Sequence, residues 1–214
     1  MNQLKTEVKV IFLDAGGVLF ETFFKGDDRI RHLLTERGYP RKKIDDGIMK
    51  AKQTKLNFIT NWNEEEQYFR RYYGAIAKEL GEVDLTNELL YFAHFARHCE
   101  LFPEVKDVLE KLRNKYRLGV ISNAMPSMDW IFDWLGIRKY FDSIILSAFV
   151  NEAKPEKAIY EIALRDIQAK PEKCIFIDDI TLNIEGAERV GIRGIHLNRE
   201  KMNLLELLQE YELL

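Results

Sequence analysis

The fold of this chain is decided by one stretch, Val8 to Phe20, with the sequence VKVIFLDAGGVLF. It begins as a nearly all-apolar run, which is typical of a strand buried on both faces of a parallel sheet. One carboxylate, Asp14, stands where this strand should end, and Gly16 and Gly17 follow it, so the backbone there can turn tightly and approach a ligand closely. In an open α/β sheet, ligands bind beyond the carboxyl ends of the strands. Asp14 is therefore a candidate reactive group, and the alternative is an aspartate that caps a turn.

The composition limits the class of protein. The 214 residues are 46% hydrophobic and 31% charged, with a formal net charge of −3 and two cysteines. These values are typical of a globular protein with one large domain, or one domain with an insert, and they provide no field that would attract nucleic acid or an anionic membrane. We find no apolar run that could span a bilayer, no signal-peptide pattern and no disulfide or zinc spacing. We therefore expect a cytoplasmic protein without a nucleic-acid or membrane partner.

The segment between Phe20 and Pro103 has helical patterns and no convincing strand. Each pattern has an apolar stripe at helical spacing and a residue that suits the start of a helix. The expected start residues are Asp27 and Asp28, then Pro40, then Asn63, and finally Asp84 or Thr86. Four amphipathic helices in series predict a small helical bundle inserted after the first strand.

From Pro103 onward, helical and strand patterns alternate. The predicted strands cover residues 116–121, 143–146, 173–177 and 194–197. This alternation predicts βαβ units, right-handed crossovers and a parallel sheet, so the fold class is α/β.

Polar residues directly follow several of the predicted strands, at the edge of the sheet where ligands bind. They are Asp14, Ser122 and Asn123, Asp178 and Asp179, with Lys154 in a connection on the same side. Each has a plain alternative role, because Ser and Asn cap helices, paired acids often begin a helix, and a lysine before proline is usually on the surface. Their convergence on one edge of one sheet instead indicates a functional site.

These motifs, in this order and at this spacing, resemble those of the haloacid dehalogenase-like (HAD) hydrolase superfamily. They are Asp14-x-Gly-Gly-Val-Leu, Ser122-Asn123, Lys154-Pro155, and Asp178-Asp179 with Asn183. The resemblance runs from about Val8 to Leu197, and the run 176–183 is especially similar to HAD phosphatases, including the phosphatase domain of soluble epoxide hydrolases and glucose-1-phosphatase-like members. It implies a Rossmann-like parallel-sheet core over residues 1–20 and 99–214, with a type-1 α-helical cap over residues 21–98.

The resemblance also implies a magnesium-dependent phosphatase. Asp14 would be the nucleophile that forms an aspartyl-phosphate. Mg²⁺ prefers hard oxygen ligands, which Asp14, the backbone carbonyl of Gly16 and Asp179 would supply. By resemblance Asp179 is the direct ligand and Asp178 a water-mediated or outer one, although the reverse order stays open.

The remaining motif residues would handle the phosphate. Ser122, Asn123 and the backbone of Gly16 and Gly17 would bind phosphate oxygens, as donors at a helix start do well. Lys154 would neutralise the nucleophile and the transferring phosphate. Asn183 would support the metal loop.

One position departs from the family pattern. Most HAD phosphatases have a second aspartate two residues after the nucleophile, which protonates the leaving group and later activates water. Here that position is Gly16, which has no side chain for either task. The sequence does not select a substitute among Glu21, His32, His94 and His98, and each histidine also fits a surface or interface role.

Four functions follow from these patterns. The first is a Mg²⁺-dependent phosphatase for a small phosphorylated metabolite, as a monomer or homodimer. The second is a metal-independent 2-haloacid dehalogenase, which also lacks the second aspartate, although the late acid pair would repel a carboxylate substrate. The third is a catalytically weak phosphate- or partner-binding protein that kept the fold. The fourth is a mutase, which normally needs the missing aspartate.

Overall fold

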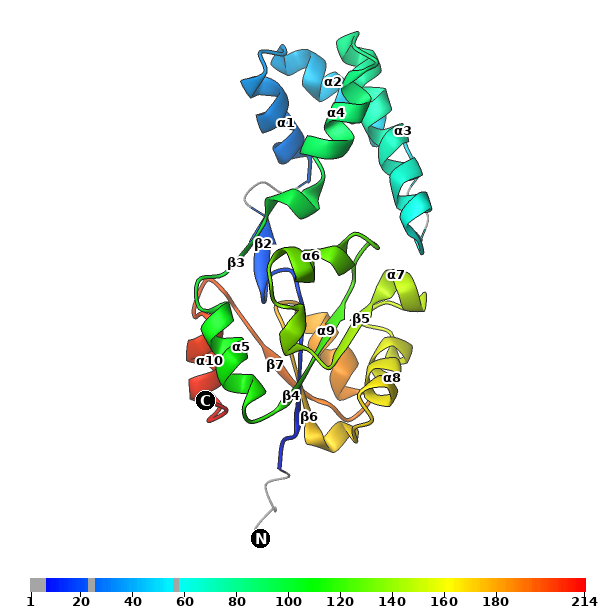
Figure 1. Ribbon diagram of the computed structural model, residues 1–214. Coiled ribbons are helices and arrows are strands. Elements are labelled where there is room, and N and C mark those ends of the chain that lie inside the picture. The colour runs from blue at the N-terminus through cyan, green and yellow to red at the C-terminus, as the bar shows by residue number, and fades with distance from the viewer. Residues whose placement is uncertain (1–6, 23–25, 56–57) are drawn as a thin grey trace. The chain divides into compact units, whose positions relative to one another are not determined.

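The computed structural model describes residues 7–22, 26–55 and 58–214, so the parts of the predicted core and cap ranges that fall on residues 1–6, 23–25 and 56–57 lie outside the described residues. The elements are labelled in Figure 1. The strands are β1 (Val10–Leu13), β2 (Phe20–Thr22), β3 (Cys99–Leu101), β4 (Arg117–Ser122), β5 (Ser143–Leu146), β6 (Cys174–Asp178) and β7 (Arg193–His196). The α-helices are α1 (Gly26–Glu36), α2 (Arg41–Ala51), α3 (Trp62–Leu80), α4 (Leu85–Phe92), α5 (Val105–Arg113), α6 (Met128–Trp134), α7 (Ser147–Val150), α8 (Lys157–Asp166), α9 (Thr181–Glu188) and α10 (Leu204–Glu210). Single 3₁₀ turns are η1 (Phe95–His98), η2 (Arg138–Tyr140) and η3 (Pro171–Lys173).

A five-stranded parallel sheet forms the centre of the first of two compact units, and its strand order is β5-β4-β1-β6-β7. Strand β1 lies in the middle, where Val10–Leu13 pair with Arg117–Val120 of β4 on one side and with Cys174–Ile177 of β6 on the other. All four residues of β1 are buried, as an all-apolar strand in a sheet covered on both faces should be. This architecture confirms the predicted Rossmann-like α/β class.

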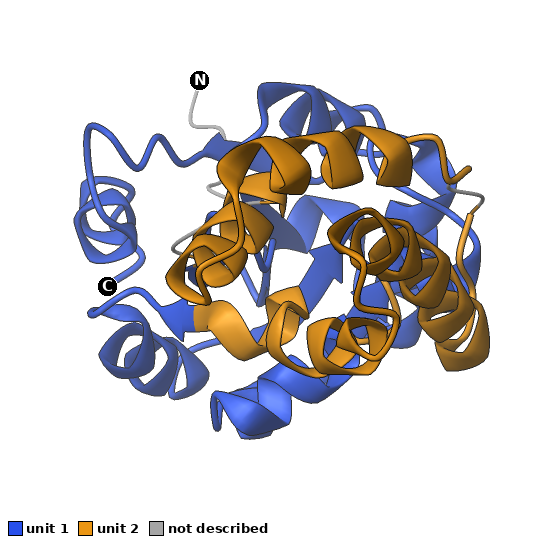
Figure 2. Ribbon diagram, turned by 90° about the horizontal axis from the view of Figure 1, so that it is seen from above, with its two compact units in different colours: residues 1–21, 100–124, 128–214 blue, residues 22–99, 125–127 orange. Residues whose placement is uncertain are grey.

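The chain divides into two compact units, which Figure 2 shows in different colours. Unit 1 is Met1–Glu21, Glu100–Ala124 and Met128–Leu214, and it contains the parallel sheet. Unit 2 is Thr22–Cys99 with Met125–Ser127, and it contains α1–α4 around an apolar cluster of its own. The domain boundaries expected from the sequence, 1–20 with 99–214 and 21–98, stay predictions.

Two details of the helical segment differ from the sequence prediction. The cap of α3 is Asn61, whose side chain accepts a hydrogen bond from the backbone N–H of Glu64, so the predicted cap Asn63 is wrong and lies inside the helix. The segment also begins with a short strand, β2, and ends with another, β3. These two strands pair in a two-stranded sheet. Strands of three residues are too short for an alternating pattern to be recognised in the sequence.

No helix in the described ranges combines the length and the apolar character needed to cross a lipid bilayer.

Candidate functional site

Three neighbouring strands end in polar residues at the same edge of the sheet. Ser122 is the last residue of β4, Asp14 follows β1, and Asp178 is the last residue of β6. The backbone N–H of Asp14 still donates to the carbonyl of Ile177 at 2.9 Å, which keeps Asp14 in register with β6. The parallel register therefore places these side chains together, although they are far apart in the sequence.

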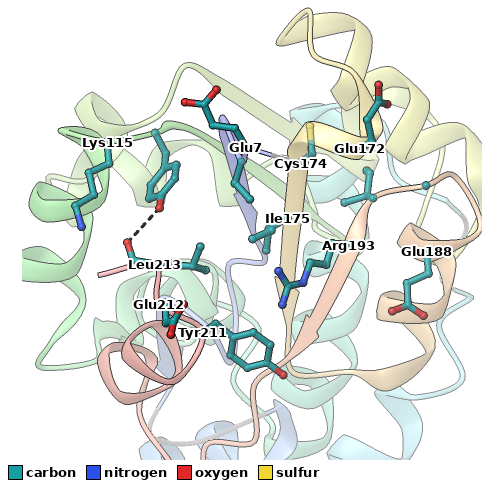
Figure 3. Close-up of a pocket in the computed structure, with 14 residues that line it drawn as sticks. Glu7, Lys115, Glu172, Cys174, Ile175, Glu188, Arg193, Tyr211, Glu212 and Leu213 are labelled. Carbon is teal, nitrogen blue, oxygen red and sulfur yellow. Dashed lines mark hydrogen bonds between the residues drawn. The ribbon is translucent and has the colours of Figure 1, made fainter. Parts of the chain in front are cut away.

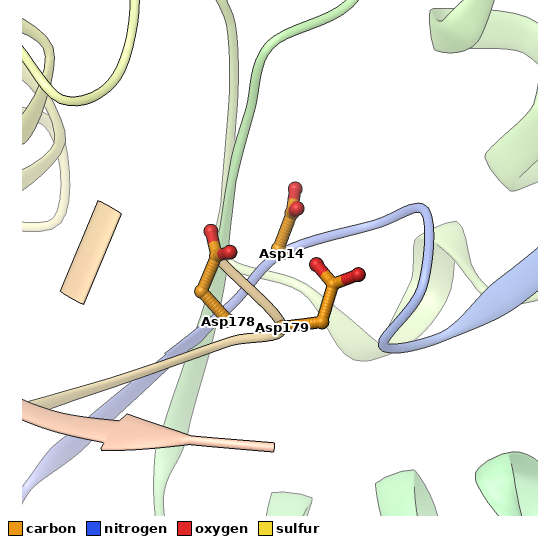
Figure 4. Close-up of side chains that lie close together, drawn as sticks. All are labelled: Asp14, Asp178 and Asp179. Atoms are coloured by element: carbon orange, nitrogen blue, oxygen red, sulfur yellow. The ribbon is translucent and has the colours of Figure 1, made fainter. Parts of the chain in front are cut away.

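The carboxylates of Asp14, Asp178 and Asp179 form a cluster, which we call the acid cluster. Each offers an oxygen within 4.8 Å of the others, and Figure 4 shows the three side chains at the ends of β1 and β6. Asp14 is 7% exposed and Asp178 is completely buried, whereas Asp179 is not buried. Like charges held this close destabilise one another unless a positive charge lies among them.

Lys154 is a buried positive charge that contacts two members of the acid cluster. Its Nζ lies 2.9 Å from Asp14 Oδ1 and 2.6 Å from Asp178 Oδ2. The side chain of Asn123 holds the lysine backbone, since its Nδ2 donates to the Lys154 carbonyl at 2.8 Å and its Oδ1 accepts from the Lys154 N–H at 2.7 Å. The Asn123 side chain therefore positions Lys154, a role that the sequence did not suggest.

The Asp178 carboxylate is surrounded by hydrogen-bond donors. Both oxygens of Asp178 accept hydrogen bonds from Asn183 Nδ2, at 3.0 and 3.1 Å, and Oδ1 also accepts from the N–H of Ile180 at 2.7 Å. With Lys154 on Oδ2 as well, the Asp178 carboxylate is held in place by protein donors. Asn183 therefore lies where the supporting residue was predicted, but it contacts Asp178.

The side chain of Asp14 lies close to hydrogen-bond donors and to the carboxylate of Asp178, which repels it. Its Oδ1 accepts a hydrogen bond from the N–H of Ala15 at 2.7 Å and lies 2.9 Å from Lys154 Nζ. Burial raises the pKa of Asp14 above its ordinary value and Asp178 adds to that shift, whereas Lys154 and Ser122 oppose it. The buried donors thus favour the charged form that a nucleophile needs, while burial disfavours it.

The turn after Asp14 is shaped by its two glycines. Gly17 has a φ of +78°, and a Cβ built there would lie 2.3 Å from Asp179 Oδ2. Its backbone therefore lies directly against the Asp179 carboxylate, in a conformation and a space that suit glycine. Gly16 differs, because a Cβ there would meet no heavy atom within 4 Å.

The four candidate substitutes for the missing acid are distributed over both units. Glu21 lies in β2 at the end of the first segment of unit 1. The histidines belong to unit 2, where His32 lies 3.3 Å from Glu36, His94 lies 3.5 Å from Glu65, and His98 Nε2 lies 2.7 Å from the Phe92 carbonyl. The structure thus gives each histidine a neighbour within its own unit.

The sequence reasoning missed residues at the end of β7 and in the segment after it. His196 Nε2 lies 3.0 Å from the Asp179 carbonyl, and the Arg199 guanidinium contacts the carbonyls of Gly17 and Val18. The rule that singled out the ends of the other strands, applied to β7, would have pointed to this segment.

A separate cavity of about 820 Å³ lies in unit 1 at the opposite ends of the strands. Its lining includes Val8, Tyr116 and Cys174, which precede or begin β1, β4 and β6. The Tyr116 hydroxyl donates to the Leu213 carbonyl at 3.3 Å, and Figure 3 shows Leu213 and Cys174 among the lining residues. None of the residues of the acid cluster lines this cavity.

Comparison with known proteins gives a family match over most of the chain. Residues 8–191 match the family model of haloacid dehalogenase-like hydrolases. The glyceraldehyde 3-phosphate phosphatase of Methanothermobacter thermautotrophicus is 37% identical over 102 residues, which are 46% of this chain and 45% of the relative. The phosphoglycolate phosphatase of Aquifex aeolicus is 26% identical over 194 residues, 87% of this chain and 83% of the relative. The chain spans about half the length of the archaeal relatives that it matches, 45% of one and 62% of another.

Solved structures share the fold at low identity. The magnesium-bound HAD hydrolase YfnB of Bacillus subtilis has a TM-score of 0.67 at 16% identity, covering 96% of this chain and 99% of its own. The 2-haloacid dehalogenase of Pseudomonas syringae has a TM-score of 0.65 at 22% identity, covering 95% and 99%. Since a magnesium-bound HAD hydrolase and a 2-haloacid dehalogenase both share this fold, the backbone similarity does not identify the reaction.

Proposed function

The chain belongs to the haloacid dehalogenase-like hydrolases, and on this premise we propose that it is a Mg²⁺-dependent phosphatase acting on a small phosphorylated metabolite. The observation that carries the proposal is the acid cluster, in which three carboxylates meet and the buried cation Lys154 contacts two of them, Asp14 and Asp178. This composition leaves an excess of negative charge where a phosphate would have to approach. A bound divalent cation removes that excess. The names of the curated relatives support the substrate class.

The residues of the acid cluster fit Mg²⁺ by their chemistry. The cation prefers oxygen ligands and keeps several waters, so it needs only a few protein ligands. By resemblance, Asp14, Asp179 and the backbone carbonyl of Gly16 would hold it. Asp178, whose oxygens accept bonds from Asn183, Lys154 and Ile180, would be the outer residue. When bound, Mg²⁺ neutralises charge on the phosphate and on the nucleophile.

Asp14 would attack phosphorus, so that a carboxylate oxygen–phosphorus bond forms while the bond from phosphorus to the leaving oxygen breaks. Water would then hydrolyse the aspartyl-phosphate, which releases inorganic phosphate and restores the carboxylate. Lys154 Nζ, 2.9 Å from Asp14 Oδ1, would stabilise the charge on the transferring group. The hydroxyl of Ser122 and the backbone N–H groups of Asn123 and Gly16 would donate to phosphate oxygens, while the Asn123 side chain orients Lys154. The Gly17 N–H, which was also predicted to bind phosphate, donates to the Phe20 carbonyl at 2.9 Å.

We further propose that residues 21–98 form the cap of a core made by residues 1–20 and 99–214. The substrate would be a small phosphorylated metabolite, and the protein would act in the cytoplasm as a monomer or homodimer. The proposal rests on the family match and on the phosphatase names of the relatives.

The test measures hydrolysis of p-nitrophenyl phosphate with and without Mg²⁺. We expect activity that EDTA abolishes and added Mg²⁺ restores, and that falls on the order of 10⁴-fold or more in Asp14→Asn because the nucleophile is lost. Asp142→Asn is the control, since Asp142 pairs with Arg113 outside the acid cluster.

Two other results would redirect the assignment. Halide release from 2-chloropropionate without metal would support a 2-haloacid dehalogenase. Binding of Mg²⁺ and phosphate without turnover would support a catalytically weak phosphate-binding protein.

A further inference from the structure

The last residue of β7, His196, and the segment that follows it contact both loops that carry the acid cluster. His196 Nε2 lies 3.0 Å from the Asp179 carbonyl, and the N–H of Leu197 donates to the Asp178 carbonyl at 3.0 Å. Three residues after His196, the Arg199 guanidinium contacts the turn after Asp14. One short segment therefore connects the loop after β1 with the loop after β6.

Arg199 grips the turn through two adjacent carbonyls. Its Nε donates to the Gly17 carbonyl at 3.3 Å, and its NH2 group donates to the Val18 carbonyl. The guanidinium lies 3.7 Å from the centre of the Phe102 ring, and the side chain is 17% exposed. A planar guanidinium can hold two carbonyls and stack on a ring at once, which the single ammonium of lysine cannot do.

Glu104 fixes the direction of this guanidinium. Its Oε1 accepts from NH1 of Arg199 and from the N–H of Leu204, the latter at 3.1 Å. Glu104 occupies the N-cap position of α5, and it has no direct contact with the acid cluster among the bonds described for it. Its influence on that cluster must pass through Arg199.

The carbonyls that Arg199 holds belong to the turn that packs against Asp179. A Cβ at Gly17 would lie 2.3 Å from Asp179 Oδ2, so a small movement of this turn would displace the carboxylate. The same turn contains the Gly16 carbonyl. The position of the turn therefore affects two of the three ligands that the cation would use.

We propose that Arg199, oriented by Glu104, is a positioning residue that sets the affinity of the acid cluster for a divalent cation. The identity of the cation rests on the proposed function. Arg199 itself touches neither the substrate nor the reacting atoms in this scheme. It acts by holding the turn from Gly17 to Val18 against Asp179.

The experiment measures binding of Mn²⁺, as a paramagnetic substitute for Mg²⁺, by electron paramagnetic resonance. The variants of the full chain are Arg199→Gln, Arg199→Lys, Glu104→Gln and the double variant Arg199→Gln with Glu104→Gln. The matched control is Arg193→Gln, which removes an exposed arginine of β7 that lies over the Tyr211 ring.

We expect Arg199→Gln to weaken Mn²⁺ binding on the order of 10- to 100-fold, the size typical for partners that orient metal ligands. Glu104→Gln should weaken it less, and the double variant should bind about as well as Arg199→Gln alone, because Glu104 acts through Arg199. At saturating Mg²⁺, kcat should stay within a few-fold of the native value while the Mg²⁺ concentration for half-maximal rate rises. Arg193→Gln should change neither quantity.

A second readout does not need the cation. Hydrogen exchange should become faster at the amides of Gly17 and Leu19, which bond inside the turn to the carbonyls of Phe20 and Ala15 at 2.9 and 2.8 Å. If Arg199→Gln does not fold, Arg199→Lys and Glu104→Gln provide the same two measurements.

Three results separate the possible failures. Native affinity for Mn²⁺ in a folded Arg199→Gln would overturn the proposal, and so would a loss of thermal stability with unchanged Mn²⁺ affinity. If the native protein binds neither Mn²⁺ nor Mg²⁺, the proposed function fails. The exchange rates of Gly17 and Leu19 then still decide whether Arg199 holds the turn.

Discussion

Both units bury carboxylates, and the surroundings of these carboxylates differ between the units. In unit 2, Glu65 is 3% exposed and accepts from the Ser127 N–H at 2.8 Å and from the Ser127 hydroxyl, with His94 Nε2 at 3.5 Å. In unit 1, the three carboxylates of the acid cluster lie close together, and Lys154 contacts two of them. Glu65 is a single charge surrounded by donors, whereas the acid cluster keeps an excess of negative charge.

The difference distinguishes a carboxylate that fastens a loop from the acid cluster, for which we propose a function. A buried carboxylate whose oxygens accept from nearby donors fastens a loop, here residues 125–127, to helix α3. A group of like charges that exceeds its counter-charges destabilises the fold unless a cation binds. The burial of an acidic side chain is therefore weak evidence that the residue is functional. The presence of several other carboxylates close to it is stronger evidence.

The largest expected effect concerns Gly16, where a Cβ would meet no atom within 4 Å. Gly16→Asp should place a carboxyl group where most family members have their acid, and it should speed hydrolysis of sugar phosphates by roughly 10²-fold. Hydrolysis of p-nitrophenyl phosphate, which has a good leaving group, should change much less. Initial rates on both substrates would test this, with Gly136→Asp as a control elsewhere in unit 1.

The native protein provides the opposing outcome for Gly16. If it hydrolyses sugar and aryl phosphates at equal rates, another residue already acts as the acid. In that case the reaction would not need a carboxyl group at position 16.

The next effect concerns the structural carboxylate. Glu65→Gln should lower the free energy of unfolding by about 1–3 kcal/mol, because an amide presents donors to the donors of Ser127 and loses the charge-assisted bonds. Urea denaturation measures the change, and the exposed Glu66→Gln in the next position of α3 is the control. Unchanged stability of Glu65→Gln would break the distinction between the two carboxylate sites.

The smallest effect separates backbone strain from crowding of the acid cluster. Gly17→Ala and Gly136→Ala both place a side chain at a positive φ, +78° and +69°, so each should cost about 1 kcal/mol in stability. A Cβ would collide with Asp179 at Gly17, whereas it would meet nothing within 4 Å at Gly136. Only Gly17→Ala should also weaken Mn²⁺ binding, by about 10-fold. Equal binding by both variants would show that the contact with Asp179 is unimportant.

Much of the fold follows from local pattern. The apolar run of β1 and the helix–strand alternation after Pro103 predicted the parallel sheet, because a strand buried on both faces has a nearly continuous run of apolar residues. The cap residue of α3 was misplaced by two positions, from Asn61 to Asn63, since both are good caps and only the backbone decides between them. The short strands β2 and β3 were missed because three residues have no recognisable period.

The sequence by itself determined which residue types stand at the strand ends, and the parallel-sheet rule was enough to group Asp14 with Asp178 and Asp179. Only the tertiary structure decided what each group contacts: Asn183 on Asp178, Asn123 on the backbone of Lys154, and Arg199 on Gly17, 182 residues away. A strand can be recognised from a short stretch of sequence, because its buried positions form a regular pattern along the chain. A hydrogen bond between distant segments has no such repeat, since its geometry exists only after the strands have paired.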